Sequence, residues 1–310
     1  MKRLSVLLIF FFSAATAGEN KTSGFAFITD SDIRQFETVI DGFRESAPGA
    51  RIGKLNLGGK ANAEVVKKFV SDFKPTVIIA LGSLSATTVA ALDTQTPVIF
   101  AMVLNYRRYA DLKKPNITGI SMEIPVETLL TQFRLLCPEL NGVAVPYSPE
   151  ASDEIVKDAK RAAEKMKIRI LEIALANPEA LKDKLRAEKA ADFNGLWMIA
   201  DFKLYNTETE AFAYLLDFAN DNRKPLLGAS EAFVKAGAFF SVSINYQSLG
   251  SQLALVTRQI TEDKIAPAKI GVTAPIGTYT VINKKSGREI FGAKFNESLL
   301  IYADKVYPEE

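Results

Sequence analysis

Apolar runs of strand length alternate along this chain with segments of helical periodicity, and this alternation constrains the fold more than any other feature. The runs are apolar throughout and do not alternate with polar residues, which is typical of parallel strands covered by helices on both faces. In chain order, the first series is expected to comprise strand 25–29, helix 31–46, strand 52–57, helix 61–73, strand 76–81, helix 83–93 and strand 97–104.

A second series follows residues 115–119. It is expected to comprise helix 125–136, strand 142–147, helix 148–166, strand 169–175, helix 178–188, strand 196–200, helix 207–220 and strand 225–229. The pattern changes beyond Ala238, where an extended segment at 239–244 precedes an amphipathic helix around 249–260, a strand at 278–282 and a helix at 298–307. Two successive βα series predict an α/β fold with two doubly wound parallel-sheet lobes joined by a hinge.

The first seventeen residues have the pattern of a cleavable signal peptide. Lys2 and Arg3 precede an apolar run at 4–12, and the small residues at 15–17 form an A-x-A cleavage site. The run is about ten residues long, which is too short to span a bilayer that needs about 20. The pattern therefore favours export over a retained membrane anchor or a buried helix. Because Cys137 lies far from the cleavage site, no lipid-anchored cysteine begins the mature chain, and a periplasmic location is expected.

Composition narrows the classes of function. The 38 basic and 36 acidic side chains nearly cancel, so the chain has no long-range field for gathering nucleic acid. It contains no histidine, which excludes Ser-His-Asp and Cys-His catalysis and histidine-rich zinc sites, while carboxylate or lysine hydrolases remain. We expect no metal and no cofactor. The lone Cys137 and Trp197, each in an apolar segment, are interpreted as core residues.

Candidate binding residues follow the strands, because open parallel sheets bind ligands beyond the carboxyl ends of their strands. The loop after the third strand begins a helix, where free N–H groups favour an anion, although an ordinary glycine turn with a serine cap is an equal alternative. Paired arginines follow the fourth strand and could hold a carboxylate or form a solvated turn. The candidates of the first lobe are Thr29, Asp30, Gly82, Ser83, Leu84, Ser85 and Asn105.

The second lobe offers acidic groups at its strand ends. Asp201 and Glu231 make sense if they receive a cation, and helix N-capping explains each equally well. A small zwitterion between an anion-binding lobe and an acidic lobe would satisfy both. The candidates here are Tyr147, Asp201, Ser230 and Glu231, with Asn245 and Tyr246 near the hinge.

Several blocks of sequence resemble the ABC-transporter substrate-binding family related to tryptophan- and tyrosine-binding proteins. They are Asn116-Ile117-Thr118-Gly119-Ile120-Ser121, Leu136-Cys137-Pro138-Glu139-Leu140, the segment 230–238, the segment 244–250, Thr280-Val281-Ile282-Asn283 and Ala303-Asp304-Lys305-Val306. The resemblance covers nearly the whole mature chain and is looser before residue 116. It departs from the family at Leu104-Asn105, where a Gly-Asp pair is frequent, and at Phe202, where a polar residue is common.

The resemblance implies a type I periplasmic binding fold that closes on a ligand. It implies an N-terminal lobe of 18–119 plus 245–276 and a C-terminal lobe of 120–244 plus 277–310 after a signal peptide at 1–17. It also implies that Ser83 and its neighbours bind a carboxylate, that Asp201, Ser230 and Glu231 act on the second lobe, and that Asn245-Tyr246 form the hinge-side floor.

The function expected on these grounds is a monomeric solute-binding component, not an enzyme, that delivers a small solute to an ABC permease in the inner membrane. The solute is expected to be an aromatic or other amino acid. One alternative is a sensory module whose closed form docks on a membrane receptor such as a histidine kinase. Another is an exported enzyme that uses Asp201 and Glu231 as an acid–base pair.

Overall fold

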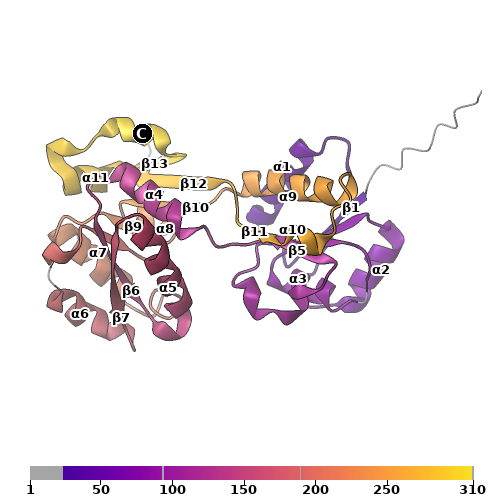
Figure 1. The fold of residues 1–310 in the computed structure, drawn as a ribbon, viewed down its shortest axis with the longest axis horizontal. Helices are drawn as coiled ribbons and strands as arrows, with labels where there is room; N and C mark the ends of the chain where they lie inside the picture. Colours follow the sequence, from indigo (N-terminus) through magenta and orange to yellow (C-terminus); the bar gives the residue numbers. More distant parts are fainter. Residues whose placement is uncertain (1–23, 93, 189, 309–310) are drawn as a thin grey trace, which may run out of the picture.

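The structure is a computed structural model that describes residues 24–92, 94–188 and 190–308. The expected signal peptide at 1–17 therefore lies outside the described residues. The chain folds into two α/β lobes that lie side by side, each built on its own sheet (Figure 1). This architecture confirms the predicted fold class.

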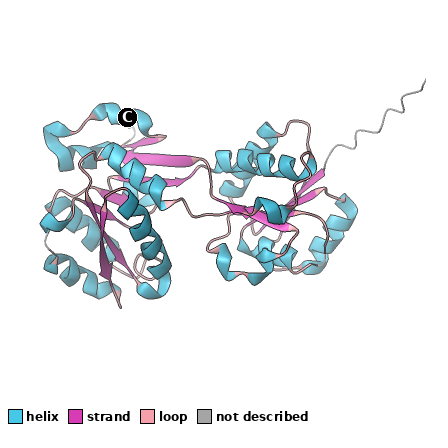
Figure 2. Cartoon of the chain, in the orientation of Figure 1, coloured by secondary structure: helices cyan, strands magenta, loops and turns pink. Residues whose placement is uncertain are grey.

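The first sheet has six strands in the order β11-β5-β4-β3-β1-β2, all paired in parallel. Helices flank it on both sides (Figure 2). Its strands are β1 (Gly24–Thr29), β2 (Arg51–Asn56), β3 (Val77–Leu81), β4 (Val98–Ala101), β5 (Ile117–Ile120) and β11 (Val272–Thr273). Its helices are α1 (Arg34–Ser46), α2 (Ala63–Phe73), α3 (Ser83–Ala90), α9 (Tyr246–Thr261) and α10 (Pro267–Ile270), with 3-10 turns η1 (Tyr106–Arg108) and η2 (Ala110–Lys113).

The second sheet has seven strands in the order β13-β12-β10-β9-β8-β6-β7. All pairs are parallel except β10 with β12. Its strands are β6 (Gly142–Tyr147), β7 (Arg169–Ala174), β8 (Gly195–Trp197), β9 (Leu226–Gly228), β10 (Phe240–Ile244), β12 (Thr278–Asn283) and β13 (Lys305–Tyr307). Its helices are α4 (Val126–Leu136), α5 (Pro149–Lys165), α6 (Leu181–Ala187), α7 (Ala211–Asp221), α8 (Glu231–Lys235) and α11 (Lys284–Phe291), with 3-10 turns η3 (Pro178–Ala180), η4 (Ala190–Asp192), η5 (Gly292–Lys294) and η6 (Glu297–Tyr302).

The central strands are buried on both faces, as their continuous apolar sequence predicts. In β1, Phe25 and Phe27 enter the core shared with α1 and α9, while Ala26 and Ile28 enter the core on the opposite face. The second sheet likewise has a separate core on each face. Trp197 and Cys137 are 5% and 6% exposed, which confirms their interpretation as core residues.

The chain passes between the lobes three times, and each passage starts or ends at the carboxyl edge of a sheet. It leaves β5 for α4 through residues 121–125. It returns from β10 to α9 through Asn245 alone. It crosses again from β11 to β12 through residues 274–277, and β12 starts beside the end of β10 because Thr278 pairs with Ile244. The three passages run between the lobes at these edges, so the carboxyl edges of both sheets border the region between the lobes (Figure 1).

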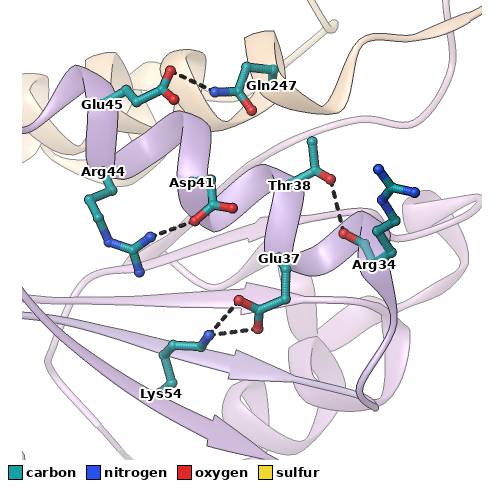
Figure 3. A network of polar contacts seen from close by, with 8 residues as sticks. All are labelled: Arg34, Glu37, Thr38, Asp41, Arg44, Glu45, Lys54 and Gln247. Carbon is teal, nitrogen blue, oxygen red and sulfur yellow. Dashed lines mark hydrogen bonds and ion pairs between the residues drawn. The ribbon is translucent and has the colours of Figure 1, made fainter.

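Helix α9 follows β10 of the second lobe along the chain, but it belongs to the first lobe and packs closely on α1 there. A Cβ atom on Gly250 would lie 2.1 Å from the carbonyl oxygen of Val39, and one on Gly42 would lie 2.1 Å from that of Gln247. Only glycine permits this approach. The Gln247 side-chain amide also donates to the Glu45 carboxylate of α1 at 2.6 Å (Figure 3). These contacts fix the second passage firmly to the first lobe.

The expected helix at 298–307 was wrong. Residues Glu297–Tyr302 form a 3-10 turn, and Lys305–Tyr307 form β13 parallel to β12. The short strands β5 and β11 were not expected either. Each of these strands has at most four residues and is held by pairing with a distant segment, which local periodicity does not reveal.

Candidate functional site

The sequence-predicted residues gather at the two facing carboxyl edges. In the first lobe, Thr29 ends β1 and Asp30 follows it, residues 82–85 follow β3, and Asn105 follows β4. In the second lobe, Tyr147 ends β6, Asp201 follows β8, and residues 230–231 follow β9. Asn245 and Tyr246 lie at the second passage. The prediction that strand ends collect the polar residues is thus met by the topology, whereas their role in binding stays a prediction.

Asp30 caps α3 across the sheet edge. Its carboxylate accepts from the backbone N–H of Leu84 at 3.0 Å and of Ser85 at 2.6 Å. These are N–H groups of the first helical turn, so Asp30 fills the place that an N-cap side chain normally takes. Gly82, with φ +105°, makes this possible, because a Cβ atom there would lie 2.4 Å from the Asp30 carboxyl carbon.

The helix start is therefore not free in the way the sequence suggested. Of the two interpretations of this helix start, free N–H groups for an anion do not fit residues 84 and 85, because Asp30 already accepts from both. The Ser85 hydroxyl is buried and donates to the Gly82 carbonyl. A ligand carboxylate at this helix start would also meet the negative charge of Asp30. The partly exposed Ser83 and Asp30 remain candidate contacts, with Asp30 suited to a cationic or hydrogen-donating group.

The loop after β4 is held in an unusual backbone conformation. Met102 and Asn105 have φ values of +58° and +47°, which L-residues rarely adopt. Val103 between them is fully buried, while Leu104 is 69% exposed. The following Tyr106 packs its ring on Phe100 with centroids 5.6 Å apart. Arg107, one of the paired arginines that could hold a carboxylate or form a solvated turn, lies over the ring of Tyr106.

Asp201 organises the edge of the second lobe from a buried position. Only 1% of the residue is exposed. One carboxylate oxygen accepts from the Ser148 N–H at 2.7 Å and the Ser152 hydroxyl at 2.8 Å, both at the start of α5. The other accepts from the backbone N–H of Lys203 at 3.0 Å and Leu204 at 3.1 Å.

These four bonds decide between the two readings of Asp201. The capping interpretation is supported, because the carboxylate is buried and already satisfied by protein donors. As placed here, Asp201 ties the loop after β8 to the start of the helix after β6. It acts as a positioning residue for the carboxyl edge.

Glu231 is paired within its own lobe. Its carboxylate accepts from the Tyr307 hydroxyl at 2.6 Å and the Lys305 ammonium at 3.0 Å. The Tyr307 hydrogen bond and the Lys305 charge hold the pKa of Glu231 below its ordinary value, against a smaller opposing effect of burial. Ser230, immediately before α8, is partly exposed. The Glu231 carboxylate, a candidate for binding a ligand cation, is therefore already paired with Lys305 and Tyr307 of β13.

Tyr147 also uses its polar atom inside the lobe. Its hydroxyl donates to Glu172 of β7 at 3.0 Å, and Glu172 pairs with Lys160 of α5. Burial, with the hydrogen bond to the Glu172 carboxylate, raises the pKa of Tyr147 to about 12. The tyrosine is 4% exposed and contributes its ring to the core.

Asn245 and Tyr246 belong to the hinge. The Asn245 side chain caps α9 by accepting from the Ser248 N–H at 3.0 Å, and its own N–H donates to the Gly277 carbonyl at 3.1 Å. Tyr246 is partly buried against the first-lobe core, and burial raises its pKa. The second and third passages are thus joined by a hydrogen bond at this point.

Sequence reasoning missed Gln252, which anchors the third passage. This α9 residue is 5% exposed; its amide donates to the Ala274 carbonyl at 2.9 Å and its oxygen accepts from the Ile276 N–H at 3.1 Å. A polar residue on the apolar face of an amphipathic helix was the signal that could have revealed it. No cluster of metal-ligating side chains occurs among the residues that the structure describes.

Residues 56–307 match the family described as ABC transporter substrate binding protein. The chain belongs to this family. Membership puts it among binding proteins for small molecules and not among enzymes. Within the described ranges, no helix combines the length and apolar character needed to cross a membrane.

A tyrosine-binding protein of Clostridioides difficile (strain R20291) is 23% identical over 227 residues. The match spans 71% of this substrate-binding chain and 64% of that protein, which is less than two thirds of the curated relative's length.

Solved structures resemble most of the chain, including both lobes. The ligand-free, open structure of a substrate binding protein with adhesive properties from Clostridium difficile has a TM-score of 0.70 at 16% identity, covering 86% of this chain and 94% of that one. An ABC domain in complex with L-Trp from Streptococcus pneumonia has a TM-score of 0.54 at 20% identity, covering 92% and 99%. At these identities the likeness shows a shared fold, that of two-lobed binding proteins.

Proposed function

We propose that the chain is the solute-binding component of an ABC transporter, which captures a small solute between its lobes and presents the closed form to a membrane permease. The proposal includes the lobe boundaries given by the sequence, 18–119 plus 245–276 and 120–244 plus 277–310. It also includes a monomeric protein in the periplasm, exported by the segment 1–17. The solute class that we propose is the amino acids.

One observation carries the proposal: all three passages lie at the carboxyl edges, so the strand-end loops that hold the candidate residues of both lobes border the space between them. A solute held from both sides stabilises the arrangement in which the edges approach. The two lobes then move as rigid bodies about short connections.

The polar groups free to meet a solute differ from those first expected. Asp30, Ser83, Asn105, Ser230 and Tyr246 are partly or fully exposed. Asp201 and Tyr147 are buried and bonded to protein groups, so we assign them the task of holding the edge in shape. Specificity then rests on the exposed set and on the backbone that Asp30 and Asp201 fix.

A thermal-shift screen of the mature protein against the twenty L-amino acids tests the proposal, because a ligand selective for the folded state raises the melting temperature. We expect at least one amino acid to raise it by several degrees, with calorimetry giving one site per chain. The same compound must be recovered unchanged after prolonged incubation. Turnover of the compound, or a set of shifts that stays flat across all twenty, would contradict the proposal.

A further inference from the structure

Exposed apolar side chains concentrate where the two lobes face each other. Among the described residues, four large apolar side chains are more than 60% exposed: Leu104 (69%), Phe202 (71%), Ile276 (68%) and Ile301 (83%). Three of the four lie at this location. Leu104 follows β4 of the first lobe, Phe202 follows β8 of the second, and Ile276 is in the third passage. Isolated exposed apolar residues are ordinary on a surface, whereas a set confined to one region indicates a contact.

Leu104 is presented by a constrained backbone. It lies between Val103, which is fully buried, and Asn105, whose φ of +47° is left-handed. Met102 at φ +58° adds a second left-handed residue two positions earlier. Such a conformation is unfavourable in a residue other than glycine and persists only when the surroundings enforce it. The loop thus holds the leucine outward at a fixed place.

Phe202 is presented by a different but equally firm arrangement. It follows Asp201, which is 1% exposed, and precedes Lys203, whose backbone N–H donates to the Asp201 carboxylate at 3.0 Å. The Phe202 carbonyl accepts from the Asn206 side chain at 3.0 Å. The turn is therefore fixed on both sides of an aromatic ring that remains in solvent.

We propose that Leu104 and Phe202 form an apolar clamp that grips the apolar body of the solute from opposite lobes when they close. This inference rests on the proposed function and adds to it the residues that select the solute. It assigns the solute class as small molecules that carry an aliphatic or aromatic group, with polar groups left for Asp30, Ser83 and Ser230. Burying both side chains contributes to the closed, liganded state alone, because they stay exposed when the lobes are apart.

The test compares affinities for apolar and polar amino acids by titration calorimetry. The probes are L-tryptophan, L-phenylalanine and L-leucine on one side and glycine and L-serine on the other. The variants are Leu104→Asn and Phe202→Asn. Ile301→Asn is the control, since Ile301 is even more exposed but lies on η6 and not in a loop that follows the carboxyl end of a parallel strand. We expect each clamp variant to bind its best apolar probe at least about 10-fold more weakly.

The remaining outcomes separate the clamp from its alternatives. Phe202→Tyr keeps the ring and should stay within about threefold of the parent. An equal loss for apolar and polar probes means that the side chains only touch each other on closure, and it overturns the selective role. Unchanged apolar binding in both variants, or a parent protein that binds only glycine or serine, also overturns the clamp while leaving the proposed function standing. A parent that binds none of the five probes overturns the clamp, and the screen of all amino acids then judges the proposed function separately.

Discussion

The two lobes share one strand plan but stabilise their carboxyl edges from opposite strands. The orders β2-β1-β3-β4-β5 and β7-β6-β8-β9-β10 correspond one for one. In the first lobe, Asp30 follows β1 and reaches the helix after β3. In the second lobe, Asp201 follows β8, the counterpart of β3, and reaches the helix after β6, the counterpart of β1.

This reciprocal arrangement shows that one aspartate per lobe suffices to join the two central βα loops. Which strand supplies it is interchangeable, because both strand ends meet at the same edge. The two aspartates differ in burial, since Asp30 is partly exposed and Asp201 is 1% exposed. The first-lobe carboxylate can therefore still meet a solute, whereas the second-lobe carboxylate is committed to structure.

Removing Asp201 should have the largest effect on stability. Asp201→Ala leaves the donors of Ser148, Ser152 and the 203–204 turn without their acceptor in a buried place. We expect the free energy of unfolding to fall by about 3 kcal/mol in urea denaturation. Ser152→Ala removes a single partner and should cost about 1 kcal/mol. Equal effects of the two variants would refute the organising role of Asp201.

Gln252 tests whether the hinge belongs to the first lobe. Gln252→Leu keeps the size of the side chain but removes its bonds to Ala274 and Ile276. We expect a loss of about 1.5 kcal/mol in urea denaturation, together with faster hydrogen exchange at residues 274–277. Leu253→Met, a volume-conserving change at the neighbouring buried position, is the control. Unaltered exchange at 274–277 would argue against this anchor.

Asp30 should matter less for stability and more for binding. Asp30→Ala removes the cap of α3, and because the carboxylate is partly exposed we expect a loss of about 1 kcal/mol in the free energy of unfolding. In calorimetry, Asp30→Ala should bind the amino acid found in the screen more weakly than the parent protein does. Ser152→Ala should bind the same amino acid with unchanged affinity. A larger stability loss for Asp30→Ala than for Asp201→Ala would reverse the comparison.

Replacing Glu231 should have the smallest effect on stability, and this effect should depend on pH. Its pKa is lowered in the folded protein by Tyr307 and then Lys305, so this pair stabilises the fold above the unfolded-state pKa and ceases to do so as the pH falls through the folded-state value. The pair is 32% and 39% exposed, which limits the effect. From about pH 5 downward, the wild type should lose slightly more stability than Glu231→Gln. If the stability of the wild type and of Glu231→Gln fell in parallel with pH, the stabilising role of the Glu231 carboxylate would be contradicted.

Most of the fold could be predicted from sequence because it rests on periodicity. The strand at 142–147 and the helices near 34–46 and 149–165 carry strong local patterns, and the structure has them within a few residues. β5, β11 and β13 were missed because short strands depend on distant partners. The C-terminal segment carries a helical pattern, yet Thr280 bonds with Asp304 and draws residues 305–307 onto the edge of the sheet.

The site was predictable in place but not in chemistry. The strand ends indicated the positions of Asp30, Ser83 and Asp201, since topology alone brings Asp30 and Ser83 to the carboxyl edge of the first sheet and Asp201 to that of the second. Their hydrogen-bond partners could not be predicted, because Asp201 bonds across 53 residues to Ser148 and Asp30 bonds across 54 to Leu84. Local sequence does not contain that information. For this reason the sequence left cation binding and helix capping as equal interpretations of Asp201, which the structure shows buried in the protein's own hydrogen-bond network.

The central claim is that a bound solute brings the two edges together, and interlobe distance tests it directly. Spin labels on Lys60→Cys after β2 and Glu208→Cys after β8 report this distance from exposed positions on opposite lobes. The native Cys137 is buried, and burial raises the pKa of its thiol, so it should react poorly with the label. With the amino acid that raises the melting temperature most, we predict a shorter and narrower distance distribution by pulsed electron paramagnetic resonance. An unchanged distribution at a concentration where calorimetry shows full binding would contradict the account.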